Sequence, residues 1–420
     1  MVNHADPTTA AVVERLASFV CARLQTELDD AVLHQAKRLL LNQLKASAEA
    51  ALQPELQQWL QQASAAATAA QRTDSAHVWW TGARTTQAEA TALNARSLRQ
   101  LDFGDTHLPS LEAGWTWGAE GDRYSGQYTA GIVPALLALA ESGGHGGRQL
   151  LEALVVGLEV GIACGMLGDG PSAQHARHGA RPLSIGAVAA CCTLLKLDQA
   201  ATTAALMKAC IAVLAAPERA DEVLAGLGQH WHLHDIALHC RPLPAWALAP
   251  VDAVLALRTQ TSDRAVRSLE LALSTPAWQL ARSGQDNIDG LRPELRHCLA
   301  AAWKLGRFSA EELDPACLAD PDILALRSRI ALVADPGCAD IAACSLTVRF
   351  DDGSAQQTRI DAFLGAPGQA LSDSQLSELF RNAADDLVLP RRSGEILHGL
   401  WGLDRAADVR PWLSLLRRPA

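Results

Sequence analysis

The sequence of 420 residues predicts a mainly α-helical protein with two domains, a large helical domain and a smaller α+β lid domain. Three observations lead to this prediction. The chain is longer than one hydrophobic core normally supports. Apolar residues recur at helical spacing through the first two-thirds of the sequence, and a strand pattern appears only after about residue 250.

The first two-thirds of the chain contains clear helical stripes. They run from Val12 to Leu24, from Val32 to Leu44 and from Leu150 to Ile162. The breaker run GGHGG at 143–147 precedes the third stripe and indicates where that helix begins. A very high alanine content between residues 185 and 215 favours closely packed helices with small side chains between them.

The character of the chain changes in its last third. Segments 251–257 and 299–305 still have a helical pattern, but Leu346, Val348 and Phe350 alternate with polar residues. Asp352-Gly353 follows at a turn position, which predicts a β-hairpin. A loop rich in Gly and Pro then leads to a helix that begins near Ser374.

These patterns predict the domain boundaries. We expect the helical domain to cover residues 1–248 and to be completed by 391–420, because the last thirty residues return to a helical pattern. The α+β lid domain would then cover residues 249–390.

Composition argues against several classes of protein. The formal net charge is −10 and the basic residues are dispersed, which disfavours nucleic acid as a partner. No run of eighteen apolar residues occurs, and the first residues lack the pattern of a signal peptide, so neither a membrane span nor secretion is expected. The ten cysteines include no CxxC pair. We therefore expect a reduced, cytoplasmic protein.

Several motifs occur in an order that points to a known family. They are AKRLLLNQL (36–44), LDFGDTH (101–107), GIVPALLALAE (131–141), GRQLLEALVVGLEVG (147–161), the segment 299–326, and SLTVRFDDG through LSDSQLSELFR (345–381). Each motif is short, but their order and spacing resemble the MmgE/PrpD family, which includes 2-methylcitrate dehydratase, cis-aconitate decarboxylase and iminodisuccinate epimerase.

The resemblance implies a fold, an assembly and a kind of chemistry. Members are homodimers, and their active site lies in a cleft between the helical domain and the lid. They act without a metal or another cofactor on small polycarboxylic acids, by dehydration, decarboxylation or epimerisation. The shared step moves a proton next to a carboxylate, which requires a base, an acid and cations that stabilise the developing negative charge.

The resemblance also implies site residues, several of which differ from the family pattern. The DFxDT motif is retained, whereas Gln127 aligns with a family histidine, Arg181 with another, His239 or Arg241 with a lysine, and His297 with a lid tyrosine. A segment that carries a further lysine motif is missing. The expected catalytic residues are Asp102, His239 and His297. The expected substrate-binding residues are Asp105, Thr106, His107, Gln127, Arg181 and Arg241.

Structural alternatives exist for most of these residues. Asp102 and Asp105 are also typical of helix caps and loop ties, Arg181 of a surface arginine, and His297 of the edge of a core. We interpret the histidines at 230, 232, 234 and 239 as a partly exposed strand or loop rather than a zinc site. The Trp-rich segment 113–124 is either a loop over the cleft or a partner-binding surface.

The sequence therefore predicts a metal-independent lyase or isomerase that acts on a small carboxylate-bearing metabolite. The alternative is a non-catalytic member of the family that serves as a binding or partner subunit. For the enzyme, we expect Asp102, Thr106, Arg181 and His297 to converge on one pocket. Arginine would bind the carboxylate, since it cannot act as a base at neutral pH, and a histidine would carry the proton.

Overall fold

The computed structural model divides the chain into two compact units. It describes all residues except 1–6, 24–25, 55, 60–74, 113–125, 168–181, 211–218, 262–263, 284–293, 339 and 419–420. Unit 1 comprises Met1–Gln100, Gly104–Ile236 and Ser372–Ala420. Unit 2 comprises Leu101–Phe103 and Ala237–Leu371. We describe each unit by itself.

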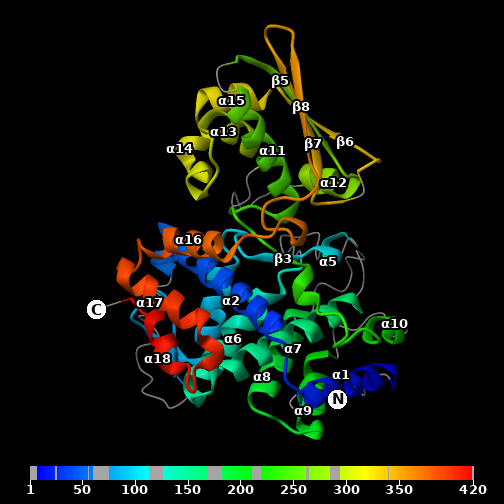
Figure 1. The fold of residues 1–420 in the computed structure, drawn as a ribbon, viewed down its shortest axis with the longest axis vertical. Helices are drawn as coiled ribbons and strands as arrows, with labels where there is room; N and C mark the ends of the chain where they lie inside the picture. Colours follow the sequence, from blue (N-terminus) through cyan, green and yellow to red (C-terminus); the bar gives the residue numbers. More distant parts are fainter. Residues whose placement is uncertain are drawn as a thin grey trace. The chain divides into compact units, whose positions relative to one another are not determined.

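Unit 1 is built almost entirely of helices, as the sequence predicts (Figure 1). Its helices are α1 Pro7–Arg23, α2 Asp30–Ala51, α4 Gln87–Leu98, α5 Leu108–Glu112, α6 Tyr128–Gly143, α7 Gly147–Met166, α8 Pro182–Leu194, α9 Gln199–Cys210, α10 Ala220–Leu224, η2 His232–Asp235, α16 Asp373–Ala384, α17 Pro390–Trp401, η6 Leu403–Arg405, α18 Arg410–Leu413 and η7 Ser414–Leu416. Its short strands are β1 Ser75–His77, β2 Arg84–Thr86 and β3 Asp105–His107. The strand β4 Ile236–Leu238 begins at the end of this unit's middle segment.

Helix α7 lies at the centre of unit 1. One hydrophobic cluster joins it to α1, α8 and α9, and Val13, Leu16, Val160 and Ile185 are fully buried within that cluster. Among the described helices, α7 is long and apolar enough to cross a membrane, but 83% of its most apolar window is buried within the protein. A helix that is apolar on every side is typical of a core position.

The C-terminal helices belong to unit 1. Helix α16 packs against α2, and the Asp373 carboxylate on α16 pairs with Arg38 on α2. The Nζ of Lys37 donates a hydrogen bond of 3.0 Å to the carbonyl oxygen of Trp401, at the end of α17. The units divide after Ile236 and after Leu371, whereas the sequence analysis placed the domain boundaries after residues 248 and 390.

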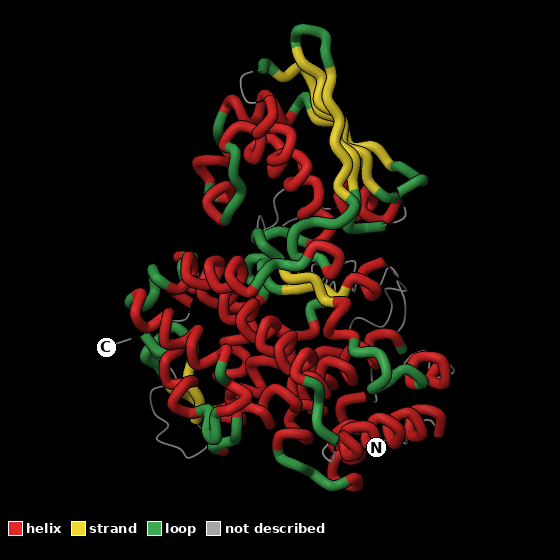
Figure 2. Tube along the Cα trace, in the orientation of Figure 1, coloured by secondary structure: helices red, strands yellow, loops and turns green. Residues whose placement is uncertain are grey.

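Unit 2 combines helices with a four-stranded sheet (Figure 2). Its helices are α11 Ala245–Thr261, α12 Thr275–Ser283, α13 Leu295–Leu305, η4 Ala310–Leu313, α14 Pro315–Leu318, α15 Pro321–Arg327 and η5 Pro367–Gln369. Its sheet strands are β5 Val266–Leu273, β6 Ile330–Ala334, β7 Cys344–Phe350 and β8 Ala355–Ile360, in the order β6-β5-β7-β8.

The sheet confirms the predicted hairpin and adds a pairing that the sequence did not reveal. Strands β7 and β8 are antiparallel, Gly353 in their turn has a φ of 83°, and Leu346, Val348 and Phe350 are buried as the alternation predicts. Strands β5 and β6 pair in parallel, with α12 to α15 between them in the chain. Pairing over that separation depends on tertiary packing, which no local pattern reports.

The crossing of α7 and α8 provides a test of packing in unit 1. A Cβ added at Gly157 would lie 2.7 Å from both the Ala190 Cβ and the Gly186 carbonyl oxygen. Although Gly→Ala raises helix propensity by about 1 kcal/mol, we expect Gly157→Ala to destabilise the protein by roughly 1–3 kcal/mol because the core is overpacked. Chemical denaturation measures this change.

Gly394 is the matched control, because it lies in helix α17 and a Cβ added there meets no atom within 4 Å. We expect Gly394→Ala to leave the free energy of unfolding unchanged or to raise it by up to about 1 kcal/mol. Equal effects of the two substitutions would show that the α7–α8 contact is not close-packed.

Candidate functional site

The LDFGDTH motif is divided between the two units. Leu101–Phe103 belongs to unit 2, and the chain from Gly104 belongs to unit 1. Within unit 2, Asp102 has a φ of 48°, a left-handed conformation that is uncommon outside glycine and is typical of special sites. Its backbone carbonyl oxygen lies 2.7 Å from Nδ1 of the buried His239 and accepts a hydrogen bond from that N–H group. This bond brings together two of the predicted catalytic residues and fixes the tautomer of the imidazole.

Within unit 1, the motif places Asp105 in a buried polar cluster. Asp105 is only 1% exposed, and Gln43 and Lys45 on α2 and Thr129 on α6 are each 0% exposed. The Lys45 charge and the polar groups of Gln43 and Thr129 all act on the Asp105 carboxylate. A buried lysine and a buried aspartate are rare in a helical core unless they are paired or functional.

The hydrogen bonds in this cluster are incomplete. Lys45 Nζ donates to Asn42 Oδ1 at 2.7 Å, and Asn42 Nδ2 donates to the Gly104 carbonyl oxygen at 2.6 Å. By contrast, both oxygens of Asp105, both amide atoms of Gln43 and the hydroxyl of Thr129 are buried without a hydrogen bond of normal geometry to the described residues. Buried polar groups in this state are exceptions that point to function or to a bound molecule.

The environment of Asp105 changes its acidity. Burial raises the pKa of this carboxyl group from 3.8 to about 7, and Thr129, Gln43 and the Lys45 charge offset only part of the increase. A pKa near 7 allows a carboxyl group to accept and donate protons at neutral pH. Asp105 is therefore suited to proton transfer, whereas the sequence analysis assigned it to substrate binding.

His107 is held firmly at the end of β3. Its Nδ1 lies 2.7 Å from the Ser110 hydroxyl, which in turn lies 3.3 Å from the Tyr128 hydroxyl. Its backbone N–H donates to the Gly126 carbonyl oxygen at 3.0 Å. Gly126 has a φ of 64°, and a Cβ there would lie 2.9 Å from the His107 carbonyl oxygen, so the turn requires glycine. Burial and the nearby His232 lower the pKa of His107 to about 3.

The other predicted residues of unit 1 are also buried or lie outside the described chain. Thr106 is fully buried on β3, and Gln127 is buried at the N-cap of α6. Arg181 and the Trp-rich segment 113–124 lie outside the described residues. The predicted convergence of Asp102, Thr106, Arg181 and His297 therefore stays a prediction.

Two predicted residues of unit 2 make structural contacts. His297 on α13 is buried, and its Nε2 donates to the Glu312 carbonyl oxygen at 3.0 Å. The guanidinium of Arg241 pairs with the Asp252 carboxylate on α11, whose other oxygen accepts a hydrogen bond from the Leu364 backbone N–H at 2.9 Å. Both contacts join elements within unit 2, so the roles of His297 in catalysis and of Arg241 in substrate binding stay predictions.

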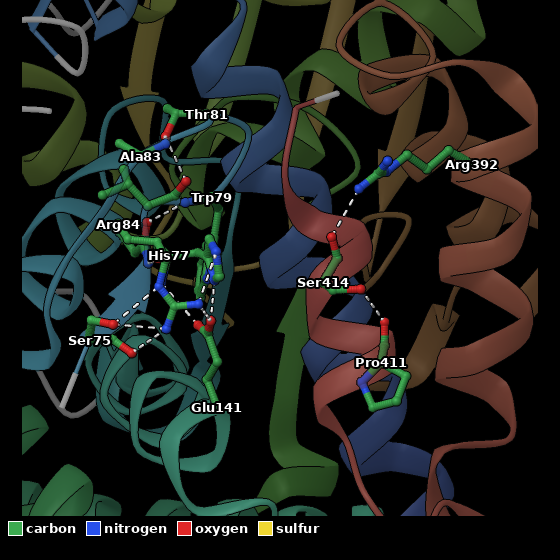
Figure 3. Close-up of polar contacts among 12 residues, drawn as sticks. Ser75, His77, Trp79, Thr81, Ala83, Arg84, Glu141, Arg392, Pro411 and Ser414 are labelled. Atoms are coloured by element: carbon green, nitrogen blue, oxygen red, sulfur yellow. Dashed lines mark hydrogen bonds and ion pairs between the residues drawn. The ribbon is translucent and has the colours of Figure 1, made fainter. Parts of the chain in front are cut away.

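A histidine–carboxylate pair elsewhere in unit 1 has a structural role (Figure 3). The imidazole of His77 on β1 pairs with Glu141 on α6, which also accepts the His77 backbone N–H at 2.9 Å. Arg84 on β2 lies 3.5 Å from the same carboxylate and donates to the Ser75 carbonyl oxygen at 2.9 Å. Burial would raise the pKa of Glu141, but these partners outweigh it and lower that pKa. The group ties the β1–β2 hairpin to α6.

The sequence analysis missed Gln43, Lys45 and Thr129. A signal for the first two was present, because NQLK at residues 42–45 places polar residues directly after the most apolar part of the α2 stripe. A helix whose polar residues are buried has no solvent-facing side at that point. No local signal marks Thr129, because its role depends on how α6 packs beside β3.

The pKa of Asp105 leads to a test by pH. Because the folded pKa is above the unfolded one, the protonated carboxyl contributes stability that is present at low pH and is lost as the pH rises through about 7. Asp105→Asn mimics the protonated acid. We expect its stability advantage over the wild type to grow by about 2–3 kcal/mol between pH 5 and pH 8. Urea denaturation at both pH values measures this difference.

The control for this test is Asp221→Asn on α10, where the side chain is 98% exposed. That substitution should leave the pH dependence of the wild type unchanged. An Asp105→Asn protein that is destabilised equally at pH 5 and pH 8 would show that the carboxyl group is charged in the folded protein.

Comparison with known proteins agrees with this architecture. The model of the MmgE/PrpD N-terminal domain matches residues 14–232, and that of the MmgE/PrpD C-terminal domain matches residues 244–403. The chain is also similar to cis-aconitate decarboxylase from Aspergillus terreus, with 23% identity over 223 residues. That match covers 48% of this chain and 45% of the relative. Since the two domain models together span most of the sequence, the chain belongs to the MmgE/PrpD family.

Proposed function

We propose that this protein is a lyase or isomerase that transfers a proton on a small carboxylate-bearing metabolite. The observation that carries the proposal is the buried cluster of Asp105, Lys45, Gln43 and Thr129, in which several polar atoms make no hydrogen bond of normal geometry to the described residues. Sites of this kind are frequently catalytic, because their burial shifts pKa values toward neutrality and excludes water. The similarity to a cis-aconitate decarboxylase supports the same class of reaction.

Each residue of the cluster has a distinct role in this proposal. Asp105 accepts or donates the proton at the carbon next to the substrate carboxylate, since its pKa of about 7 permits both directions. Lys45, positioned by its hydrogen bond to Asn42, supplies the positive charge that stabilises the enediolate-like intermediate. The Gln43 amide and Thr129 hydroxyl hydrogen-bond the substrate's oxygen atoms. His239, held by the Asp102 carbonyl oxygen, remains the second candidate for the proton carrier.

We expect Lys45→Met and Asp105→Asn each to lower turnover by roughly a hundredfold or more, because each removes a charge-handling group from the reaction. The assay incubates the full chain with cis-aconitate and related di- and tricarboxylates in D₂O. Proton NMR then detects deuterium incorporation, decarboxylation or loss of water. Lys208→Met on α9 is the control, because Lys208 takes no part in the cluster, and it should retain wild-type turnover.

Two outcomes of this experiment separate the alternatives. A wild-type protein that binds these acids in a thermal-shift assay but turns none of them over favours a binding or partner subunit. Turnover that is unchanged by both cluster substitutions would contradict the assignment of Asp105 and Lys45.

We further propose that the protein is a cytoplasmic homodimer, formed through the helical unit. The family resemblance and the many Ala- and Leu-rich helices support this assembly. Light scattering at micromolar concentration should report about twice the chain mass of 44.6 kDa. A particle of 44.6 kDa would contradict the dimer.

A further inference from the structure

A second group of buried polar residues in unit 1 is separate from the proposed proton-transfer cluster. It consists of His107 from β3 and His232 and Asp235 from η2. One ring nitrogen of each histidine and one carboxylate oxygen of Asp235 all lie within 4.8 Å of one another. The rings of His107 and His232 meet edge to face, with their centroids 5.4 Å apart.

The two imidazoles present nitrogens that no described group satisfies. His107 is 0% exposed, and its Nε2 is buried without a hydrogen bond. The Nδ1 of His232 is also buried without a hydrogen bond, since the Asp235 carboxylate lies 3.7 Å away. Leaving buried polar atoms unpaired is unfavourable, because they lose their hydrogen bonds to water. A cation between them would satisfy both nitrogens.

The surroundings of the group orient its members as ligands. With Nδ1–H of His107 donating to Ser110, the Nε2 carries the lone pair that binds a metal. His230 Nε2 lies 2.6 Å from Asp235 Oδ2, the same oxygen that faces His232 Nδ1, and holds that carboxylate in place. Glu159 on α7 is fully buried, and the backbone amides of His232 and Leu233 act on its carboxyl group.

We propose that His107, His232 and Asp235 bind a divalent transition-metal ion. Two imidazole nitrogens and one carboxylate oxygen suit Zn²⁺ or Fe²⁺, and three protein ligands leave a coordination position open. Bond lengths of about 2.0–2.2 Å require ligand atoms about 3.3 Å apart, so the group must contract slightly. The side chains of His232 and Asp235 are 18% and 30% exposed, so neither is enclosed on all sides by the core.

The sequence analysis interpreted the histidines at 230, 232, 234 and 239 as a partly exposed strand or loop rather than a zinc site, and the proposal departs from that interpretation at His232. Among the four histidines at 230, 232, 234 and 239, the proposal uses only His232, and His107 comes from a motif more than a hundred residues earlier. The proposal also departs from the sequence-based expectation of a protein without a metal. It does not depend on the proposed function, which uses no metal ion.

Metal binding to the full chain tests the proposal directly. The protein is treated with a chelator, and Zn²⁺ is then titrated calorimetrically and counted by elemental analysis after gel filtration. We expect one Zn²⁺ per chain for the wild type. His232→Ala and the nearly isosteric Asp235→Asn should each weaken binding by more than about 100-fold. His234→Ala is the matched control, because His234 is an exposed residue of the same short helix outside the group.

Co²⁺ substitution identifies the ligands. The wild-type Co²⁺ protein should show visible d–d bands without a thiolate-to-cobalt charge-transfer band, even though the ten cysteines are free thiols. Circular dichroism of the metal-free variants checks that each variant is folded. If His232→Ala does not fold, Asp235→Asn alone tests the proposal. The proposal is overturned by a wild type that binds no stoichiometric Zn²⁺, by a thiolate band, or by equal binding in Asp235→Asn and His234→Ala.

Discussion

Burial of Lys45 and Asp105 in the helical unit imposes a solvation cost that the surrounding structure has to offset. Neither side chain reaches water, and removing a charge from water without full compensation costs several kcal/mol. The compensation here is partial. Asn42 accepts a hydrogen bond from Lys45, but the Asp105 oxygens make no normal hydrogen bond to the described residues. The carboxyl group responds by holding its proton up to about pH 7.

The close packing of the helices in unit 1 holds the buried polar residues around Asp105 in place. Helix α7 is buried on all sides and lies against α8 at the Gly157–Gly186 contact, where no side chain separates the backbones. A close-packed core of this kind limits how far polar residues can move to find partners. Asp105, Gln43 and Thr129 therefore lie close together without completing hydrogen bonds of normal geometry, and the scaffold holds them in that arrangement.

Three histidine environments show how the same side chain takes different tasks. His77 is paired with Glu141 and ties a hairpin to α6, and His297 is held by the Glu312 carbonyl oxygen. His107 is fixed through one ring nitrogen by Ser110, and like His297 it keeps a buried second nitrogen without a hydrogen bond to the described residues. What separates His107 from the other two is its neighbours, because a nitrogen of His232 and a carboxylate oxygen of Asp235 lie within 4.8 Å of its ring nitrogen.

The sequence by itself determined the helical core, the β7–β8 hairpin and the family, because these depend on local periodicity, turn chemistry and the order of motifs. It also singled out Asp102, Asp105, Thr106 and His107 through one motif. Only the tertiary structure decided that α2 buries Lys45 beside Asp105 and that η2 brings His232 and Asp235 to His107. The parallel β5–β6 pair was decided in the same way. Such contacts join distant segments through packing, and no pattern within either segment encodes its partner.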